Sequence, residues 1–181
     1  VIASRWEFGD GTVVSNRPFA SHAWSVAGDF PVILRAYNES YPAGVTATVT
    51  VHVVTQPVHH VLAGNLTPVP PYLSWATAAT NIQDAVDAAS IPGALVLVTN
   101  GTYASGGTSA GRVFLDKYVV IQSVNGPQFT VINGGGTVRC AWLANGNWLS
   151  GFTLTNGSAS DSGGGVFFGG AMSEAVVSNC V

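Results

Sequence analysis

The sequence predicts an all-β protein, and three observations carry that prediction. Only 8% of the 181 residues are charged, against roughly a quarter in an ordinary soluble domain, and 22 are glycine. The stretch Val45–Val53 alternates Val or Ala with Thr or His, the pattern of a half-buried strand. Three further runs rich in β-forming residues each end in Asn-Gly. This combination is typical of many strands and turns whose surface is solvated by hydroxyls and amides.

The three Asn-Gly runs form a repeat. They occupy residues 95–101, 120–126 and 152–157, and their glycines lie 25 and 31 residues apart. These spacings are too long for a hairpin repeat and fit one turn of a coil. We therefore interpret the runs as stacked rungs of a parallel β-helix, which we expect to occupy residues 76–181.

Alignment on Asn-Gly predicts which side chains stack. Because side chains alternate along a strand, each rung is expected to contribute one residue to an inward column. The run Val177–Val181 matches Leu149–Thr153, which adds Cys180 as the fourth member. The Asn side chains are expected to form a hydrogen-bonded ladder. Cys140 falls on another side of the coil, so we expect no disulfide. The predicted core column is Val96, Ile121, Phe152 and Cys180, and the predicted ladder is Asn100, Asn125 and Asn156.

One helix is predicted, over residues 80–90. Thr80 or Asn81 can serve as its N-cap, and Pro92-Gly93 stops it. Its apolar residues recur at i, i+3, i+4 and i+7 and make one face. We expect this face to cover the N-terminal end of the coil, which would otherwise expose core side chains. The face comprises Ile82, Ala85, Val86 and Ala89.

Residues 1–56 carry other motifs. Trp6-Glu-Phe-Gly-Asp-Gly11 is followed by Ser21-His-Ala-Trp24, by Ala27-Gly-Asp-Phe30 and by the alternating strand. These motifs resemble the PKD domain, a small immunoglobulin-like β-sandwich. Two strands that usually precede the Trp in that family are missing here, so we expect a partial sandwich. The resemblance implies spacing, adhesion or presentation of a neighbouring module.

Two pairs of polar residues in or near this half invite a functional reading. We interpret Asp10 as a turn cap and His22 as a partner of loop backbone, because no second carboxylate accompanies them. His59 and His60 are adjacent in a predicted strand and should point to opposite faces, which disfavours a shared metal. They lie in residues 57–75, which we expect to form a junction between the two modules.

The runs Ile82–Ala89, Val96–Tyr103, Leu149–Gly157 and Val177–Val181 carry a second resemblance. They are similar to the N-terminal rungs of right-handed parallel β-helix proteins of the pectate-lyase-like superfamily. This likeness implies a fold more strongly than an activity. Large bacterial surface proteins of this type often join such a coil to PKD modules, which implies an extracellular or cell-surface location.

The outward positions beside the predicted columns carry no charge. Polysaccharide lyases and hydrolases on this fold place carboxylates with Arg or Lys on the outer face of one sheet. We therefore predict no catalytic residue, no cofactor and no metal ligand on these rungs. The outward positions are Leu97, Thr99, Gln122, Val124, Thr153 and Thr155.

The main functional hypothesis is a non-catalytic extracellular structural or adhesive segment. The repeat stops in mid-rung at Val181, so we expect its open ends to contact the rest of a longer chain, or other copies stacked into a fibre. One alternative is a fragment of a polysaccharide lyase or hydrolase whose active site lies outside this chain. Another is a glycan-binding module that uses Trp142 and Trp148.

Composition disfavours two classes of partner. A net charge of −3 leaves no basic stripe for nucleic acid. No apolar run approaches the ~20 residues that span a bilayer, so no membrane span is expected.

Overall fold

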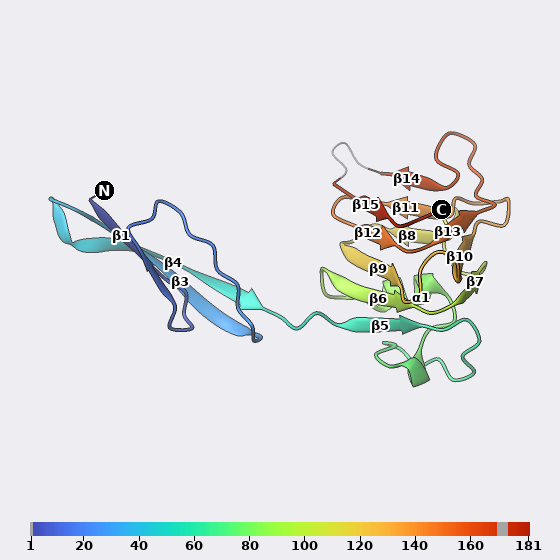
Figure 1. The fold of residues 1–181 in the computed structure, drawn as a ribbon, viewed down its shortest axis with the longest axis horizontal. Coiled ribbons are helices and arrows are strands. Elements are labelled where there is room, and N and C mark those ends of the chain that lie inside the picture. The colour runs from blue at the N-terminus through green and yellow to red at the C-terminus, as the bar shows by residue number, and fades with distance from the viewer. Residues whose placement is uncertain (1, 170–173) are drawn as a thin grey trace. The chain divides into compact units, whose positions relative to one another are not determined.

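The structure, a computed structural model, describes residues 2–169 and 174–181. The chain divides into two compact units (Figure 1), which we call the N-terminal unit (Val1–Thr55) and the coil unit (Gln56–Val181). Strands predominate in both, so the all-β prediction is confirmed. No helix in the described part of the chain is long and apolar enough to cross a membrane.

The N-terminal unit is one antiparallel sheet. Its strands are β1 (Ala3–Glu7), β2 (Val13–Ser15), β3 (Gly28–Asn38) and β4 (Tyr41–Val53), in the order β2-β1-β3-β4. The registers place Trp6, Leu34 and Ala47 side by side, and this row lies on the apolar face. The charged Arg5 and Arg35 pair with each other on the opposite face.

The valines of β4 lie on this apolar face, as the alternation predicts, but they are less covered than expected. Val45 is 54% exposed and Val49 is 60% exposed. The sequence suggested a half-buried strand, and that prediction is wrong for these two residues. The reason is that the described residues of this unit form a single sheet, so no second layer packs on the outer part of the face.

The coil unit contains three parallel sheets. We call β15-β12-β9-β6-β5 sheet 1, β13-β10-β7 sheet 2 and β14-β11-β8 sheet 3. The chain visits the three sheets in turn, once per rung, which is the topology of a parallel β-helix. The strands are β5 (Val58–Val61), β6 (Ala94–Val98), β7 (Gly101–Tyr103), β8 (Val113–Leu115), β9 (Val119–Ser123), β10 (Thr130–Asn133), β11 (Ala141–Leu143), β12 (Trp148–Ser150), β13 (Thr153–Thr155), β14 (Val166–Phe168) and β15 (Val176–Ser178).

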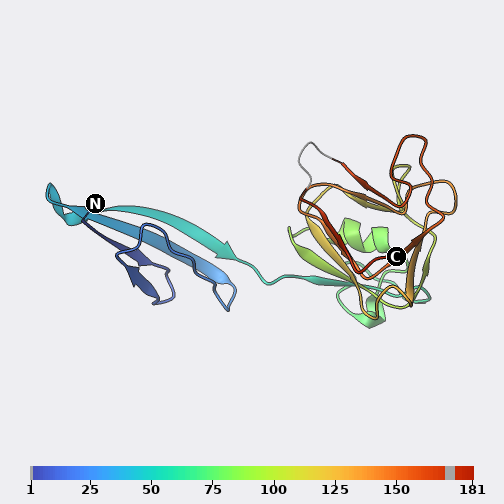
Figure 2. The same cartoon turned by 45° about the horizontal axis from the view of Figure 1, so that its top comes forward.

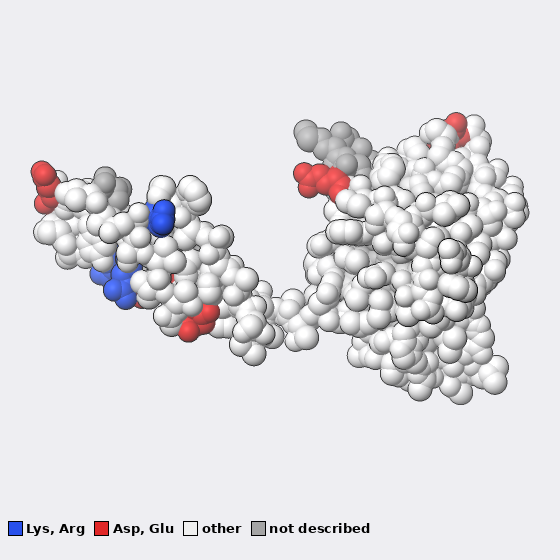
Figure 3. Space-filling model, in the orientation of Figure 1, with Lys and Arg blue, Asp and Glu red and all other residues white. Residues whose placement is uncertain are grey.

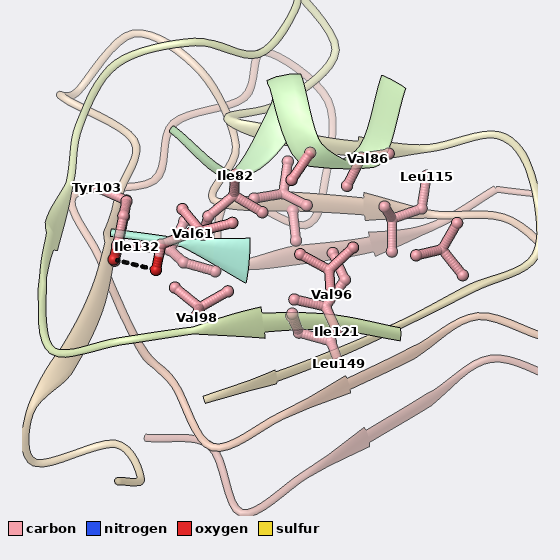
Figure 4. Close-up of a cluster of buried hydrophobic side chains, with 14 of the residues drawn as sticks. Val61, Ile82, Val86, Val96, Val98, Tyr103, Leu115, Ile121, Ile132 and Leu149 are labelled. Carbon is pink, nitrogen blue, oxygen red and sulfur yellow. Dashed lines mark hydrogen bonds between the residues drawn. The ribbon is translucent and has the colours of Figure 1, made fainter. Parts of the chain in front are cut away.

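The core fills the space between the three sheets and is almost wholly apolar (Figure 4). In sheet 1, Val96 pairs with Ile121 and Ile121 with Leu149, and all three are fully buried. The one large polar side chain among them, Tyr103, donates its hydroxyl to the Thr99 carbonyl at 3.0 Å. Burial raises the pKa of this phenol.

The predicted core column is therefore corrected at its third and fourth members. Leu149, and not Phe152, follows Ile121, and Val177 follows Leu149. Phe152 is fully buried, but it lies at the next corner beside Thr130, where the Val181 N–H donates to its carbonyl at 3.0 Å. Cys180, the residue before Val181, is half-buried beside Phe152 and packs against the core.

The position of Asn-Gly in the third rung explains the shift. In the first two rungs Asn-Gly follows a strand of sheet 1, at residues 100–101 and 125–126, and the count back from it gives the observed pairing. The corner after β12 is only Gly151-Phe152, so the third Asn-Gly, at residues 156–157, follows β13 in sheet 2. A count back from it therefore compares a strand of sheet 2 with strands of sheet 1.

Helix α1 (Ile82–Ala88) covers the first rung, as predicted. The Asn81 side chain caps it by accepting from the Asp84 N–H at 3.0 Å. The predicted apolar face is buried against the core, and Figure 2 shows α1 within the outline of the three sheets. The remaining helical turn is η1 (Trp75–Thr77).

Residues 57–75 are not a separate junction, because they belong to the first rung. Strand β5 pairs with β6 on one side. On its other side, the N–H groups of His60 and Leu62 donate to the carbonyls of Tyr72 and Ala79, each at 2.8 Å. Residues 62–80 thus cover an edge that would otherwise be open to strand pairing.

The edge of β8 is closed by a side chain. The Gln83 Oε1 accepts from the Phe114 N–H at 2.8 Å, and the Gln83 Nε2 donates to the Phe114 carbonyl at 3.1 Å. This amide therefore replaces the backbone of a missing neighbouring strand. Gln83 is only 7% exposed, so both hydrogen bonds are shielded from water.

Candidate functional site

The structure brings two of the three predicted ladder residues together. Asn125 Nδ2 donates to Asn100 Oδ1 at 2.8 Å. Asn156 does not join them, because it follows β13 in sheet 2 and lies at the next corner. There its backbone has a φ of 50°, and its carbonyl accepts from the Gly136 N–H at 2.7 Å. The predicted three-residue ladder is therefore corrected to a pair.

The outer face of sheet 1 spans five strands, and its side chains include no Asp, Glu, Lys or Arg. Its side chains form two strips that follow the stack of strands. In the view of Figure 3, the visible face of this unit shows no Lys or Arg, and Asp or Glu only near its upper edge. One strip is Val58, Leu95, Val120, Trp148 and Val176, and the other is His60, Leu97, Gln122, Ser150 and Ser178.

Trp148 is the exposed aromatic residue of the first strip. Its side chain is 46% exposed. Its indole Nε1 donates to Ser178 Oγ at 3.1 Å, and that hydroxyl donates to Ser150 Oγ at 3.0 Å. The indole is therefore held by the neighbouring rung while its ring remains accessible.

Tyr118 lies diagonally next to Trp148 on the same face, and our sequence reasoning missed it. It is 49% exposed. Glycines flank it in the rungs on both sides: a Cβ at Gly93 would lie 3.3 Å from its Cε1, and a Cβ at Gly146 would lie 3.6 Å from its Cδ2. Both glycines have a positive φ, 80° at Gly93 and 79° at Gly146, which itself favours glycine, and the Tyr118 ring packs against both of them. A sequence signal existed, since Gly93 and Gly146 each stand two residues before a member of the first strip, but the register was needed to see it.

Trp142, the other predicted glycan contact, lies on the outer face of sheet 3. It pairs with Phe114 on one side and Phe167 on the other. The rings of Trp142 and Phe114 are 4.7 Å apart. The indole is half-buried, and Gly169 lies so close to it that a Cβ there would be 1.9 Å from the ring. Trp142 is therefore mainly a packing residue.

All three cations of the coil unit bind parts of the protein itself. Arg112 donates to the carbonyls of Gly106, Asn133 and Gly134 at 2.7, 3.0 and 3.3 Å. Lys117 donates to the Asp87 carbonyl at 3.1 Å.

Arg139, the third cation, pairs with Asp161 and lies 4.8 Å from the centre of the Phe167 ring. The Ser162 N–H, and to a lesser extent Arg139, lower the pKa of Asp161. These contacts pin loops to rungs and occupy the groups that a uronate substrate would need.

The two histidines of β5 point to opposite faces, as strand alternation predicts. His59 is buried, and its Nδ1 donates to the Pro71 carbonyl at 2.6 Å, while its Nε2 has no hydrogen-bond partner. His60 packs on Trp75, with ring centres 4.3 Å apart. Among the described residues, no three His, Cys, Asp or Glu side chains lie close enough to hold a metal ion.

Both cysteines are free thiols. Cys140 is buried and its Sγ donates to the Thr155 carbonyl at 3.1 Å. Burial raises the pKa of this thiol. A buried thiol held by a carbonyl is a packing residue and a poor nucleophile.

In the N-terminal unit, Asp10 and His22 bind each other. Asp10 Oδ1 accepts from the Thr12 N–H at 2.9 Å, so it caps the turn as predicted. His22 Nε2 lies 2.6 Å from Asp10 Oδ2, and its ring stacks on Phe8 at 4.5 Å. The sequence assigned His22 to loop backbone, and this assignment is wrong. The pair joins the turn at Asp10 to the aromatic cluster around Phe8 and therefore has a structural role. We call the Asp10–His22 pair the clasp.

This clasp predicts an acid-sensitive N-terminal unit. The Thr12 N–H and then His22 lower the pKa of Asp10 from 3.8 to about 2. A carboxyl whose pKa is depressed by folding stabilises the fold above its unfolded pKa, and that contribution disappears as the pH falls through its folded pKa. We expect the unit to lose stability between about pH 4 and pH 2, and Asp10→Asn to be less stable near neutral pH and to show a flatter acid limb. Urea unfolding followed by NMR signals of residues 1–55 measures this.

The exposed pair Asp29–His52 supplies the matched control for that experiment. Both side chains are 70% exposed, so Asp29→Asn should leave the acid limb as steep as in the wild type. An Asp10→Asn protein with the wild-type slope would show that the clasp does not stabilise the unit.

Comparison with known proteins identifies the class of the N-terminal unit. Residues 1–53 match the family model described as the PKD domain, which confirms the resemblance seen in the sequence. PKD domains are adhesion-type modules of extracellular and cell-surface proteins, and an extracellular location is supported accordingly. Neither the curated proteins nor the solved structures include a significant match to this chain.

Proposed function

We propose that the chain is a non-catalytic structural or adhesive segment of an extracellular or cell-surface protein, of the type found in bacteria. The PKD match supports the extracellular and adhesive part of this proposal. The non-catalytic part rests on where the charged side chains of the coil unit lie and what they bind. Its cations are bound to the protein's own carbonyls, Asp161 and Phe167, and the outer face of sheet 1 has no charged side chain.

We also propose kinship with the right-handed pectate-lyase-like superfamily, which the parallel sheets and the capping helix support. An enzyme of that kind would need carboxylates paired with a free Arg or Lys on one face. The nearest approach to such a set in the described residues is Arg139 with Asp161, and both are engaged in holding a loop. The lyase or hydrolase alternative therefore receives less support than the adhesive one.

End-to-end stacking into a fibre also receives little support at the first rung. A second copy stacked on this end would pair with the terminal strands β5, β7 and β8. The edges of β5 and β8 are occupied by residues 62–80 and by Gln83. Helix α1 lies over the core between them. Self-assembly through this end would require these elements to be displaced.

Two readouts on the whole chain test the proposal. Beads coated with the chain should adhere to polysaccharide- or cell-coated surfaces more strongly than beads coated with albumin. Incubation with pectate, alginate and neutral polymers, with calcium present, should release no new reducing ends above a heat-denatured control. Release of reducing ends in proportion to chain concentration, and its loss in Arg139→Ala, would overturn the proposal in favour of an enzyme.

A further inference from the structure

We propose that the outer face of sheet 1 binds a neutral polysaccharide, with Tyr118 and Trp148 as stacking residues. This inference rests on the proposed adhesive function and adds to it a class of ligand and a binding surface. It starts from the two aromatic side chains that are about half exposed on one flat sheet. Trp148 is one strand further along the stack than Tyr118 and two residues along the strand, so their Cα atoms are about 8 Å apart.

Both aromatic side chains are held in place before any ligand arrives. The ring of Tyr118 packs between Gly93 and Gly146 of the neighbouring rungs. The indole of Trp148 is tied to Ser178, which is tied in turn to Ser150. Side chains that are already ordered lose little conformational entropy on binding, so such residues contribute more of their contact energy to affinity.

The chemistry of the face favours sugar over other ligands. The C–H faces of pyranose rings are apolar and pack on aromatic rings, while their hydroxyls need donors and acceptors. Gln122, Ser150 and Ser178 form such a polar row directly beside the aromatic strip. An open sheet face that extends over successive rungs suits a linear polymer better than a small ligand, which is usually enclosed in a concave pocket.

The charge pattern selects neutral sugars within that class. A uronate-containing polymer carries a carboxylate on many residues, and its binding in a dry contact requires Arg or Lys. The two strips contain neither, and the cations of the coil unit are bound elsewhere in the protein. An acidic polymer would therefore be desolvated here with no compensating partner. Neutral glucans, xylans or mannans meet no such penalty.

Binding of the whole chain to insoluble and soluble neutral polysaccharides tests this proposal. The panel comprises a glucan, a xylan and a mannan, with pectate and alginate as acidic comparisons. We expect saturable binding to at least one neutral polymer and none to the acidic ones. Trp148→Ala and Tyr118→Ala should each weaken binding about tenfold or more, the effect of removing an aromatic anchor from an interface. Trp148→Phe, which keeps a stacking ring, should retain most of the affinity.

Phe129→Ala is the matched control, because Phe129 is 53% exposed and lies in the corner after β9, away from both strips. It should bind like the wild type, and circular dichroism should show all four variants folded. The proposal is overturned by binding to uronate polymers only, by binding that Trp148→Ala and Tyr118→Ala leave unchanged, or by no binding to any neutral polymer. The last outcome, with bead adhesion intact and no sugar released, would leave the proposed function standing. Cleavage of a polymer would instead overturn the proposed function.

Discussion

Phe152→Ala is expected to lower the free energy of unfolding of the coil unit by about 3–5 kcal/mol. Phe152 is fully buried at the corner between sheets 1 and 2, beside Thr130 of the second rung and Cys180 of the last. Truncation removes most of a large side chain from a packed site, and the hydrogen-bonded strands on both sides restrict collapse into the cavity. Urea unfolding of the whole chain, followed by circular dichroism, gives the change.

Phe129→Ala provides the control for this prediction as well. Phe129 stands in the long corner of the second rung and is mostly exposed. Its replacement should change stability by less than about 0.5 kcal/mol. Equal losses in the two variants would contradict the placement of Phe152 in the core.

Gln83→Leu is expected to cost about 2–3 kcal/mol, although it replaces a polar side chain by an apolar one on a buried helix face. Leucine fits the size of the site, but it leaves the Phe114 N–H and carbonyl without partners. An unsatisfied buried group costs about 1–3 kcal/mol. In the variant, the Phe114 amide should also exchange its hydrogen with solvent faster than in the wild type. A packing defect alone would not affect this amide selectively.

Gln122→Leu makes the same chemical change on an exposed strand position in sheet 1. It should leave both the unfolding midpoint and the exchange of Phe114 near the wild-type values. Were Gln83→Leu equally harmless, the glutamine would not be closing the edge of β8. The first rung would then be more open to pairing than we argue.

The sequence predicted the elements of the coil well, because their signals are local. The amphipathic residues of α1 and the Asn81 cap lie within a few positions of one another. The repeat Leu149-Ser150 with Val177-Ser178 also predicted a true pairing, because it compares two strands directly and does not depend on the corners.

The register of the third rung could not be predicted in the same way. Asn-Gly is a turn signal, and turns of unequal length place it at different corners of the coil. Asn156 and Phe152 were misassigned for this reason. Nothing in Gly151-Phe152 itself indicates that these two residues form a corner without Asn-Gly.

The candidate binding face was only half visible in the sequence. Trp148 could be picked out as an aromatic residue, whereas Tyr118 became a candidate only when pairing placed it between two glycines of other rungs. In the N-terminal unit the alternation of β4 correctly identified its apolar face, but alternation does not reveal whether a second layer covers that face. Whether a second layer packs on this face depends on the tertiary structure.

Binding of the whole chain and of Trp148→Ala to one insoluble neutral polysaccharide, with soluble sugar measured in the same tubes, tests the account most directly. We expect saturable binding by the wild type, about tenfold or greater weakening in the variant, and no sugar released by either. Equal binding by the two proteins, or release of soluble sugar by the wild type, would contradict it.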